Sequence, residues 1–108
     1  YRANAVTQGE GANAVTQGDW ANAVTQGYRA NAVTQGDWAN AEVRGLESIA
    51  VALGNNSTAK GAIGCWIVLA ERNDNRSIKN VKAVKIDGEK IKADTWYRLE
   101  NGEFSEVK

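Results

Sequence analysis

A nine-residue unit repeats along the first half of the chain and constrains the fold more than any other feature. Its core, ANAVTQG, recurs almost unchanged from Tyr1 to Gly36 and decays through Gly54, and each copy adds a variable pair such as Tyr-Arg, Glu-Gly or Asp-Trp. A fixed short period is typical of a solenoid, in which each unit packs only against its neighbours. The repeat therefore predicts an architecture, but by itself it indicates no activity.

Each copy divides into a turn and a strand. The final glycine tolerates positive φ, so the glycine and the variable pair predict a turn. Ala-Asn-Ala-Val-Thr-Gln alternates with period two, and valine and threonine favour extended backbone. Two units of nine residues then make a coil of eighteen that stacks on the next coil through parallel, in-register hydrogen bonds. We therefore predict an all-β fold, a parallel β-roll or β-solenoid of nine-residue half-coils with a C-terminal antiparallel β cap.

Strand parity leaves two candidates for the inward face. One carries Ala3, Ala5 and Thr7, and the other carries Asn4 and Val6. We favour the alanine face, because methyl-sized side chains let two sheets approach closely without voids. The rival places the valines inside with the asparagines stacked as amide ladders. An outward threonine column could order ice, and inward threonines would reject that hypothesis.

The composition changes near Gly61. The first 59 residues contain no lysine, whereas lysines crowd the remainder. We therefore place a solenoid at 1–61 and a cap at 62–108, with Gly54–Gly61 as a turn between them. The cap is expected to be an antiparallel meander with hairpin turns at Asp87-Gly88 and Asn101-Gly102. Its expected strands cover residues 63–71, 78–86, 90–92, 95–99 and 104–107, with a polar turn at 72–76.

Large aliphatic residues enter the last repeat. They replace polar residues of the earlier units, which indicates that the cap covers the final coil. The residues expected to pack between solenoid and cap are Leu46, Ile49, Val51, Leu53 and Trp66.

The repeat also predicts contact surfaces. With alanines inside, the valines and tryptophans form an exposed apolar stripe, and such stripes usually meet a partner. A repeating face is self-complementary under a rotation axis parallel to the solenoid, which favours a homo-oligomer, dimer or trimer. The alternative is a ligand-binding module that contacts a surface glycan or a protein through turn aromatics. The candidate contact residues, expected along one edge, are Tyr1, Arg2, Trp20, Tyr28, Arg29 and Trp38.

Composition disfavours several other partners and settings. Thirteen basic residues balance thirteen acidic ones, so nothing favours nucleic acid, and no apolar run is long enough to insert in a membrane. Cys65 lies in an apolar run, which indicates a buried structural thiol. The chain lacks methionine and starts at a repeat boundary, which indicates a fragment of a longer protein.

The sequence predicts no enzyme, no cofactor and no metal. Histidine is absent, and with it the commonest general base and the usual zinc ligand. The pairs Asp87 with Glu89 and Asp37 with Glu42 are interpreted as solvated turn or rim carboxylates. The repeats lack the GGxGxD turns of calcium-binding rolls, and Gly54–Gly61 lacks the spacing of a phosphate-binding loop.

Two resemblances follow from these motifs. ESIAVALGNNSTAKGAIG, at Glu47–Gly64, resembles the head repeats of trimeric autotransporter adhesins, which implies a β-roll assembled as a trimer. Across the whole chain, the nonapeptides followed by GAIGCWIVLAER and VKAVKIDGEKIKADTWYRL are similar to uncharacterised bacterial and prophage-encoded repeat proteins. That resemblance implies a β-solenoid stalk or fibre with a C-terminal cap. The expected role is a structural or adhesive module, in an extracellular or virion-associated setting.

Overall fold

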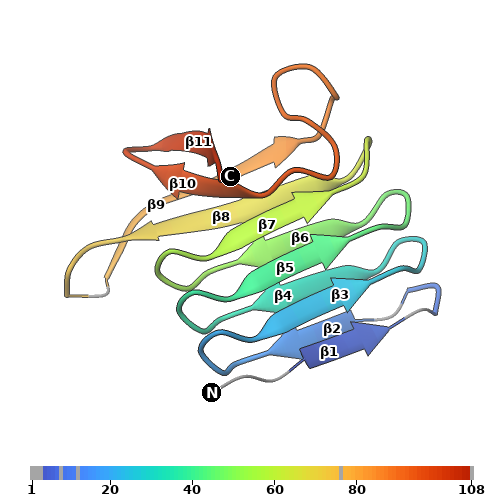
Figure 1. Ribbon diagram of the computed structural model, residues 1–108, viewed down its shortest axis with the longest axis horizontal. Coiled ribbons are helices and arrows are strands. Elements are labelled where there is room, and N and C mark those ends of the chain that lie inside the picture. The colour runs from blue at the N-terminus through green and yellow to red at the C-terminus, as the bar shows by residue number, and fades with distance from the viewer. Residues whose placement is uncertain (1–3, 8, 12, 76, 108) are drawn as a thin grey trace.

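The chain forms a β-solenoid closed at its C-terminal end by antiparallel strands (Figure 1). The computed structural model describes residues 4–7, 9–11, 13–75 and 77–107, and these residues contain no helix that could span a membrane. The strands are β1 Asn4–Thr7, β2 Asn13–Thr16, β3 Asn22–Thr25, β4 Asn31–Thr34, β5 Asn40–Val43, β6 Ile49–Ala52, β7 Thr58–Gly61, β8 Trp66–Arg72, β9 Ile78–Lys85, β10 Tyr97–Glu100 and β11 Glu103–Glu106.

Successive strands alternate between two sheets. Sheet A has the order β1-β3-β5-β7-β10-β11, and sheet B has the order β2-β4-β6-β8-β9. From β1 to β7 the parallel pairs join residues eighteen apart, for example Asn22 with Asn40 in sheet A and Val33 with Val51 in sheet B. The predicted fold class is therefore confirmed, and β1 to β8 form four coils.

The ninth residue of the unit must be glycine because successive coils touch there. A Cβ atom on Gly36 would lie 2.1 Å from the carbonyl oxygen of Gly18, far inside van der Waals contact. Positive φ occurs instead at the second residue of the variable pair, where Trp20 has 63° and Arg29 has 57°. The turns lie where the sequence predicts, but the reason given for them is wrong: the glycine allows close stacking, and the pair makes the left-handed bend.

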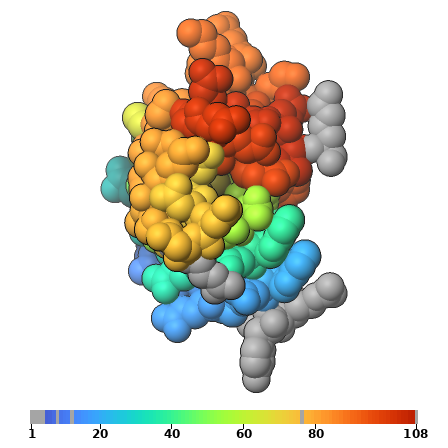
Figure 2. Space-filling view, turned by 90° about the vertical axis from the view of Figure 1, so that its left-hand side faces the viewer, coloured from blue at the N-terminus to red at the C-terminus, as the bar shows by residue number. Residues whose placement is uncertain are grey.

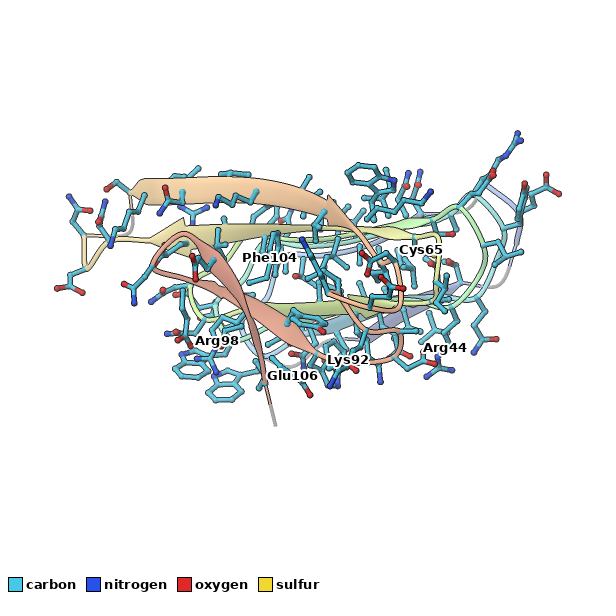
Figure 3. The ribbon with its side chains drawn as sticks, turned by 90° about the horizontal axis from the view of Figure 1, so that it is seen from above. Arg44, Cys65, Lys92, Arg98, Phe104 and Glu106 are labelled. Atoms are coloured by element: carbon cyan, nitrogen blue, oxygen red, sulfur yellow. The ribbon has the colours of Figure 1, made fainter. Side chains whose placement is uncertain are left out.

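The alanine face points inward, as predicted. Ala23 and Ala32 are fully buried, and so are Thr25 and Thr34, which rejects an ice-binding threonine face. The predicted amide ladders also form, but on the outer faces of the sheets, where Asn31 Nδ2 donates to Asn13 Oδ1 at 3.0 Å. Small inward side chains therefore set the thickness of the roll, which Figure 3 shows from above as two closely spaced layers.

Parallel stacking continues past Gly61, where the sequence places the domain boundary. Residues 58–61, expected to be part of a turn, form β7 and pair with β5, and β8 pairs with β6. Cys65 takes the place that Ser48 and Ser57 hold in earlier turns, because all three donate a hydrogen bond to a glycine carbonyl of the coil below. The thiol is buried, as predicted.

The cap pairs with both sheets of the last coil. Strand β9 runs antiparallel to β8, while β10 runs antiparallel to β7 and forms a hairpin with β11. Asn101 and Gly102 both have positive φ, as expected for the predicted Asn-Gly turn. The predicted hairpin at Asp87-Gly88 and strand at 90–92 are wrong: residues 86–96 form a loop that carries the chain from sheet B to sheet A.

The core under the cap differs from the predicted one. It contains Ile67, Leu69 and Ile86, and Phe104 packs against it between the layers (Figure 3). The expected packing residues Leu46, Ile49 and Trp66 are instead 59%, 40% and 44% exposed, and Val51 and Leu53 are half-buried. The prediction is wrong because side chains alternate between the two sides of a strand, and the large residues of β6 and Trp66 of β8 occupy outward positions. Leu46 lies in a turn.

Substitution of Gly36 by alanine tests the close stacking of coils. Because the new Cβ would meet the Gly18 carbonyl at 2.1 Å, Gly36→Ala should lower the free energy of unfolding, measured in urea, by about 3 kcal/mol or more. Gly11→Ala is the control: Gly11 has φ 72° and open space around a Cβ, so the loss should be about 1 kcal/mol. Equal losses in the two variants would contradict a steric role for the ninth residue.

The inward threonines form a column of hydroxyl groups inside the roll. The hydroxyl oxygens of Thr7, Thr16, Thr25 and Thr34 have no hydrogen-bond partner among the described residues. A buried polar group without a partner costs about 1 to 3 kcal/mol. The chain itself shows that an apolar residue fits this column, because Val43 pairs with Thr25 and is fully buried.

Thr25→Val should therefore raise the free energy of unfolding, by about 1 kcal/mol. Valine keeps the shape of threonine and removes the unpartnered hydroxyl. Thermal or urea unfolding measures the change, and Thr25→Ala, which also leaves a cavity, should destabilise. An unchanged or lower stability of Thr25→Val would show that the hydroxyl is satisfied inside the roll.

Candidate interaction surfaces

The variable pairs lie on two opposite edges of the solenoid. Because a coil contains two units, alternate copies share an edge: the turns after β2 and β4 carry the Asp-Trp pairs, and the turn after β3 carries Tyr28 and Arg29. The six candidate contact residues are therefore not brought together on one edge. Tyr1 and Arg2 lie outside the described residues. The signal that separates the edges was available in the predicted coil of eighteen residues, because only pairs that lie eighteen residues apart, such as Asp19-Trp20 and Asp37-Trp38, share an edge.

The first edge is a tryptophan ladder. The rings of Trp20 and Trp38 stack with centroids 5.4 Å apart and planes inclined by 7°, and each residue is about half exposed. The aspartates of the same pairs join successive coils by hydrogen bonds of 2.9 Å. The Asp37 backbone N–H donates to Asp19 Oδ1, and the Asn55 backbone N–H donates to Asp37 Oδ1. Figure 2 looks on to this edge, where the turns follow one another from blue through green to yellow. In-register stacking therefore places like side chains on one another.

The opposite edge is held by charges and an aromatic ring. Tyr28 Oη donates to Glu47 Oε2 at 3.0 Å, and Arg29 Nε lies 3.5 Å from the same oxygen. The Arg29 guanidinium also lies 5.1 Å from the centre of the Tyr28 ring. These contacts join consecutive coils, and the exposed geometry makes each of them weak.

The outer face of sheet B is apolar along its centre and toward the cap. Val15, Val33, Val51 and Val68 stand in one column, because each pairs with the next across the sheet. Beside them, Ile49 pairs with Trp66, and both are exposed. On β9, Ile78 and Val81 are also exposed, at 55% and 50%. Several large hydrophobic side chains therefore share the outer surface of sheet B, which we call face B.

The outer face of sheet A carries charges at the equivalent positions. Glu42 follows Val24 in its column, and Lys60 follows Glu42. Glu42 is only 8% exposed and pairs with Arg44 at 2.5 Å and with Lys60 at 3.9 Å. The Lys60 ammonium also lies 4.7 Å from the centre of the Trp96 ring. On this surface, face A, each of these charges already has a partner within the chain.

Carboxylates of the cap hold backbone in place. The Glu71 carboxylate accepts three hydrogen bonds. Oε1 accepts one from Asn80 Nδ2 and one from Gly102 N, and Oε2 accepts one from Asn101 N. This side chain therefore fixes the β10–β11 turn to β8. The Asn80 amide, followed by these backbone N–H groups, lowers the pKa of Glu71. Asp87 Oδ1 accepts from Glu89 N and Ile91 N, and these N–H groups lower the pKa of Asp87.

The described part of the molecule offers surfaces rather than a pocket. It has no cavity, and no group of three or more metal-binding side chains lies within its described ranges. Comparison with known proteins finds no matching family, no matching curated protein and no matching solved structure. The function is therefore inferred from the chemistry of the edges and faces.

The role of Glu71 predicts a pH dependence of stability. A carboxylate whose pKa is lower in the folded chain stabilises the fold above its ordinary pKa, and this contribution is lost as the pH falls through the lowered value. Glu71→Gln should therefore be less stable than the wild type at pH ~7, and the difference should shrink as the pH falls below ~4. Urea unfolding at several pH values across this range measures the difference in free energy of unfolding between the two proteins. A difference that does not change with pH would contradict the role of the Glu71 charge.

Proposed function

We propose that this chain is a non-enzymatic structural module, a rigid β-solenoid that associates with copies of itself. The observation that carries the proposal is face B. A column of valines repeats there at the spacing of the coils, half-buried except for exposed Val15, and the large exposed side chains of Ile49 and Trp66 stand beside it. Apolar patches of this kind on soluble proteins mark interaction sites.

The hydrogen bonds between coils support a structural role. Hydrogen bonds from side chains join neighbouring coils, in addition to the parallel backbone ladders. They involve asparagine, aspartate and serine. A solenoid held in this way behaves as a rod, because every coil is fixed on the coil below it. Its length is set by the number of repeats.

The acidic residues support a role without catalysis. Glu71 and Asp87 fix turns of the cap, Asp37 joins two coils, and Glu42 forms ion pairs. A carboxylate that is held by structural donors is poorly placed to move a proton to or from a substrate. Of the four carboxylates in the acidic pairs noted in the sequence, Asp37, Glu42 and Asp87 thus have structural explanations.

Binding of a glycan by the turn aromatics is disfavoured by the geometry of the ladder. Trp20 and Trp38 lie face to face at 5.4 Å, so each ring covers one face of the other. Only the outer face of each ring is therefore left for a sugar to stack on. Tyr28 lies on the opposite edge and donates its hydroxyl to Glu47. The aromatics therefore do not form one platform, and assembly is the better supported function.

The solution mass tests this proposal. We expect light scattering coupled to size exclusion to give a mass above 11.6 kDa that rises toward a whole multiple with concentration, over roughly 1 μM to 1 mM. Trp20→Ala/Trp38→Ala should keep this behaviour, because these residues lie on an edge. A monomer mass at every concentration would refute self-association, and loss of the oligomer in the tryptophan variant would assign the interface to the edge.

A further inference from the structure

We propose that two copies of this chain pack through face B, related by a two-fold axis that runs parallel to the solenoid along the valine column. This inference rests on the proposed self-association, and it adds the surface and the symmetry. The occupant of face B is a second copy, for reasons given by the pattern of residues across sheet B.

Three columns of outward side chains cross face B. The middle column is formed by valines, Val15 to Val68, and ends at Ala83 on β9. One flanking column runs Asn13, Asn31, Ile49, Trp66 and Lys85. The other flanking column lies two residues beyond the valines and contains Gln17, Gln35, Leu53 and Ala70, with Val81 on β9. Ala70 is already almost covered in the single chain, at 5% exposure.

The proposed axis places each strand over the same strand of the second copy and exchanges the flanking columns. Ile49 then faces Leu53, and Trp66 faces the small Ala70. Nearer the N-terminus, Asn31 faces Gln35, whose amide groups can pair with it. Apolar residues thus meet apolar residues, amides meet amides, and the valine column meets itself.

No like charges oppose one another in this arrangement. The three columns contain no charged residue until Lys85 on β9, and the axis places Lys85 over Val81. A lysine can lay its aliphatic stem on such a residue and keep its ammonium in water. Burial of face A would instead desolvate the Glu42, Arg44 and Lys60 ion pairs, which is unfavourable.

The area of face B predicts a dimer of modest stability. Five strands spaced ~4.8 Å apart and five residues per strand at ~3.3 Å each give a footprint of roughly 400 Å² per copy. A standard interface buries about 800 Å² of accessible surface per partner. We therefore expect a dimer that dissociates on dilution into the micromolar range.

Val51→Lys tests the face. Val51 lies on the axis at the central strand of sheet B, so the substitution would bring two ammonium groups together and should weaken the dimer by roughly 100-fold. Val24→Lys is the matched control, because Val24 holds the same position of the unit on face A, is also half-buried, and pairs there with Glu42. The dissociation constant of Val24→Lys should stay within about threefold of the wild type.

Both variants are first compared with the wild type by circular dichroism and thermal unfolding, so that misfolding is not mistaken for dissociation. If the wild type is a monomer at every concentration, the proposed function itself fails. If the wild type dimerises and Val51→Lys keeps the dimer, self-association stands and face B is refuted. If the dimer is lost in Val24→Lys and kept in Val51→Lys, the interface is face A.

A crosslink gives a second readout that does not depend on weakening the dimer. A residue on the two-fold axis lies close to its own copy, so Val51→Cys should form a disulfide-linked dimer when an oxidant such as diamide is added. Val24→Cys should not, and native Cys65 is buried and should not interfere. Crosslinking of Val24→Cys, or of neither variant under conditions where the wild type is dimeric, would overturn the proposed arrangement.

Discussion

The fold depends on the contact between one coil and the next at the ninth residue of the unit. Gly36 and Gly54 each face a carbonyl oxygen of the coil below, at a distance where any Cβ atom would clash. The absence of a Cβ atom there allows the strands to approach to hydrogen-bonding distance in a register of eighteen residues. Every ladder of like side chains on the surface, whether of asparagine, valine or tryptophan, is a consequence of that register.

The repeat allowed most of the solenoid to be predicted, because the same nine residues specify the strand alternation, the turn and the inward face. Prediction of the cap was less complete. Asn101-Gly102 formed the expected hairpin, since both strands of that hairpin belong to one sheet. Asp87-Gly88 did not, because β9 ends in sheet B and β10 must pair with β7 in sheet A. A dipeptide encodes a local bend, whereas the sheet that the next strand joins is decided by distant contacts.

The candidate surfaces show a second limit of sequence reasoning. Ile49, Val51 and Trp66 are large and apolar, which suggested a place in the core, yet strand parity places them outside. The interior of the first coils is filled mainly by alanine and threonine, and larger residues such as Val43, Ile67 and Leu69 enter it toward the cap. In a roll this thin, the position of a residue in the unit is a better guide to burial than its hydrophobicity.

The difference between the two faces arises at one position of the unit. The sixth residue is valine in the early repeats, and it then becomes Glu42 and Lys60 on face A but Val51 and Val68 on face B. Because consecutive units alternate between the sheets, substitutions in alternate units alter one face and leave the other unchanged. The less regular repeats near the cap therefore make the two faces chemically different. Face A carries charges that are paired within the chain, and face B carries apolar side chains.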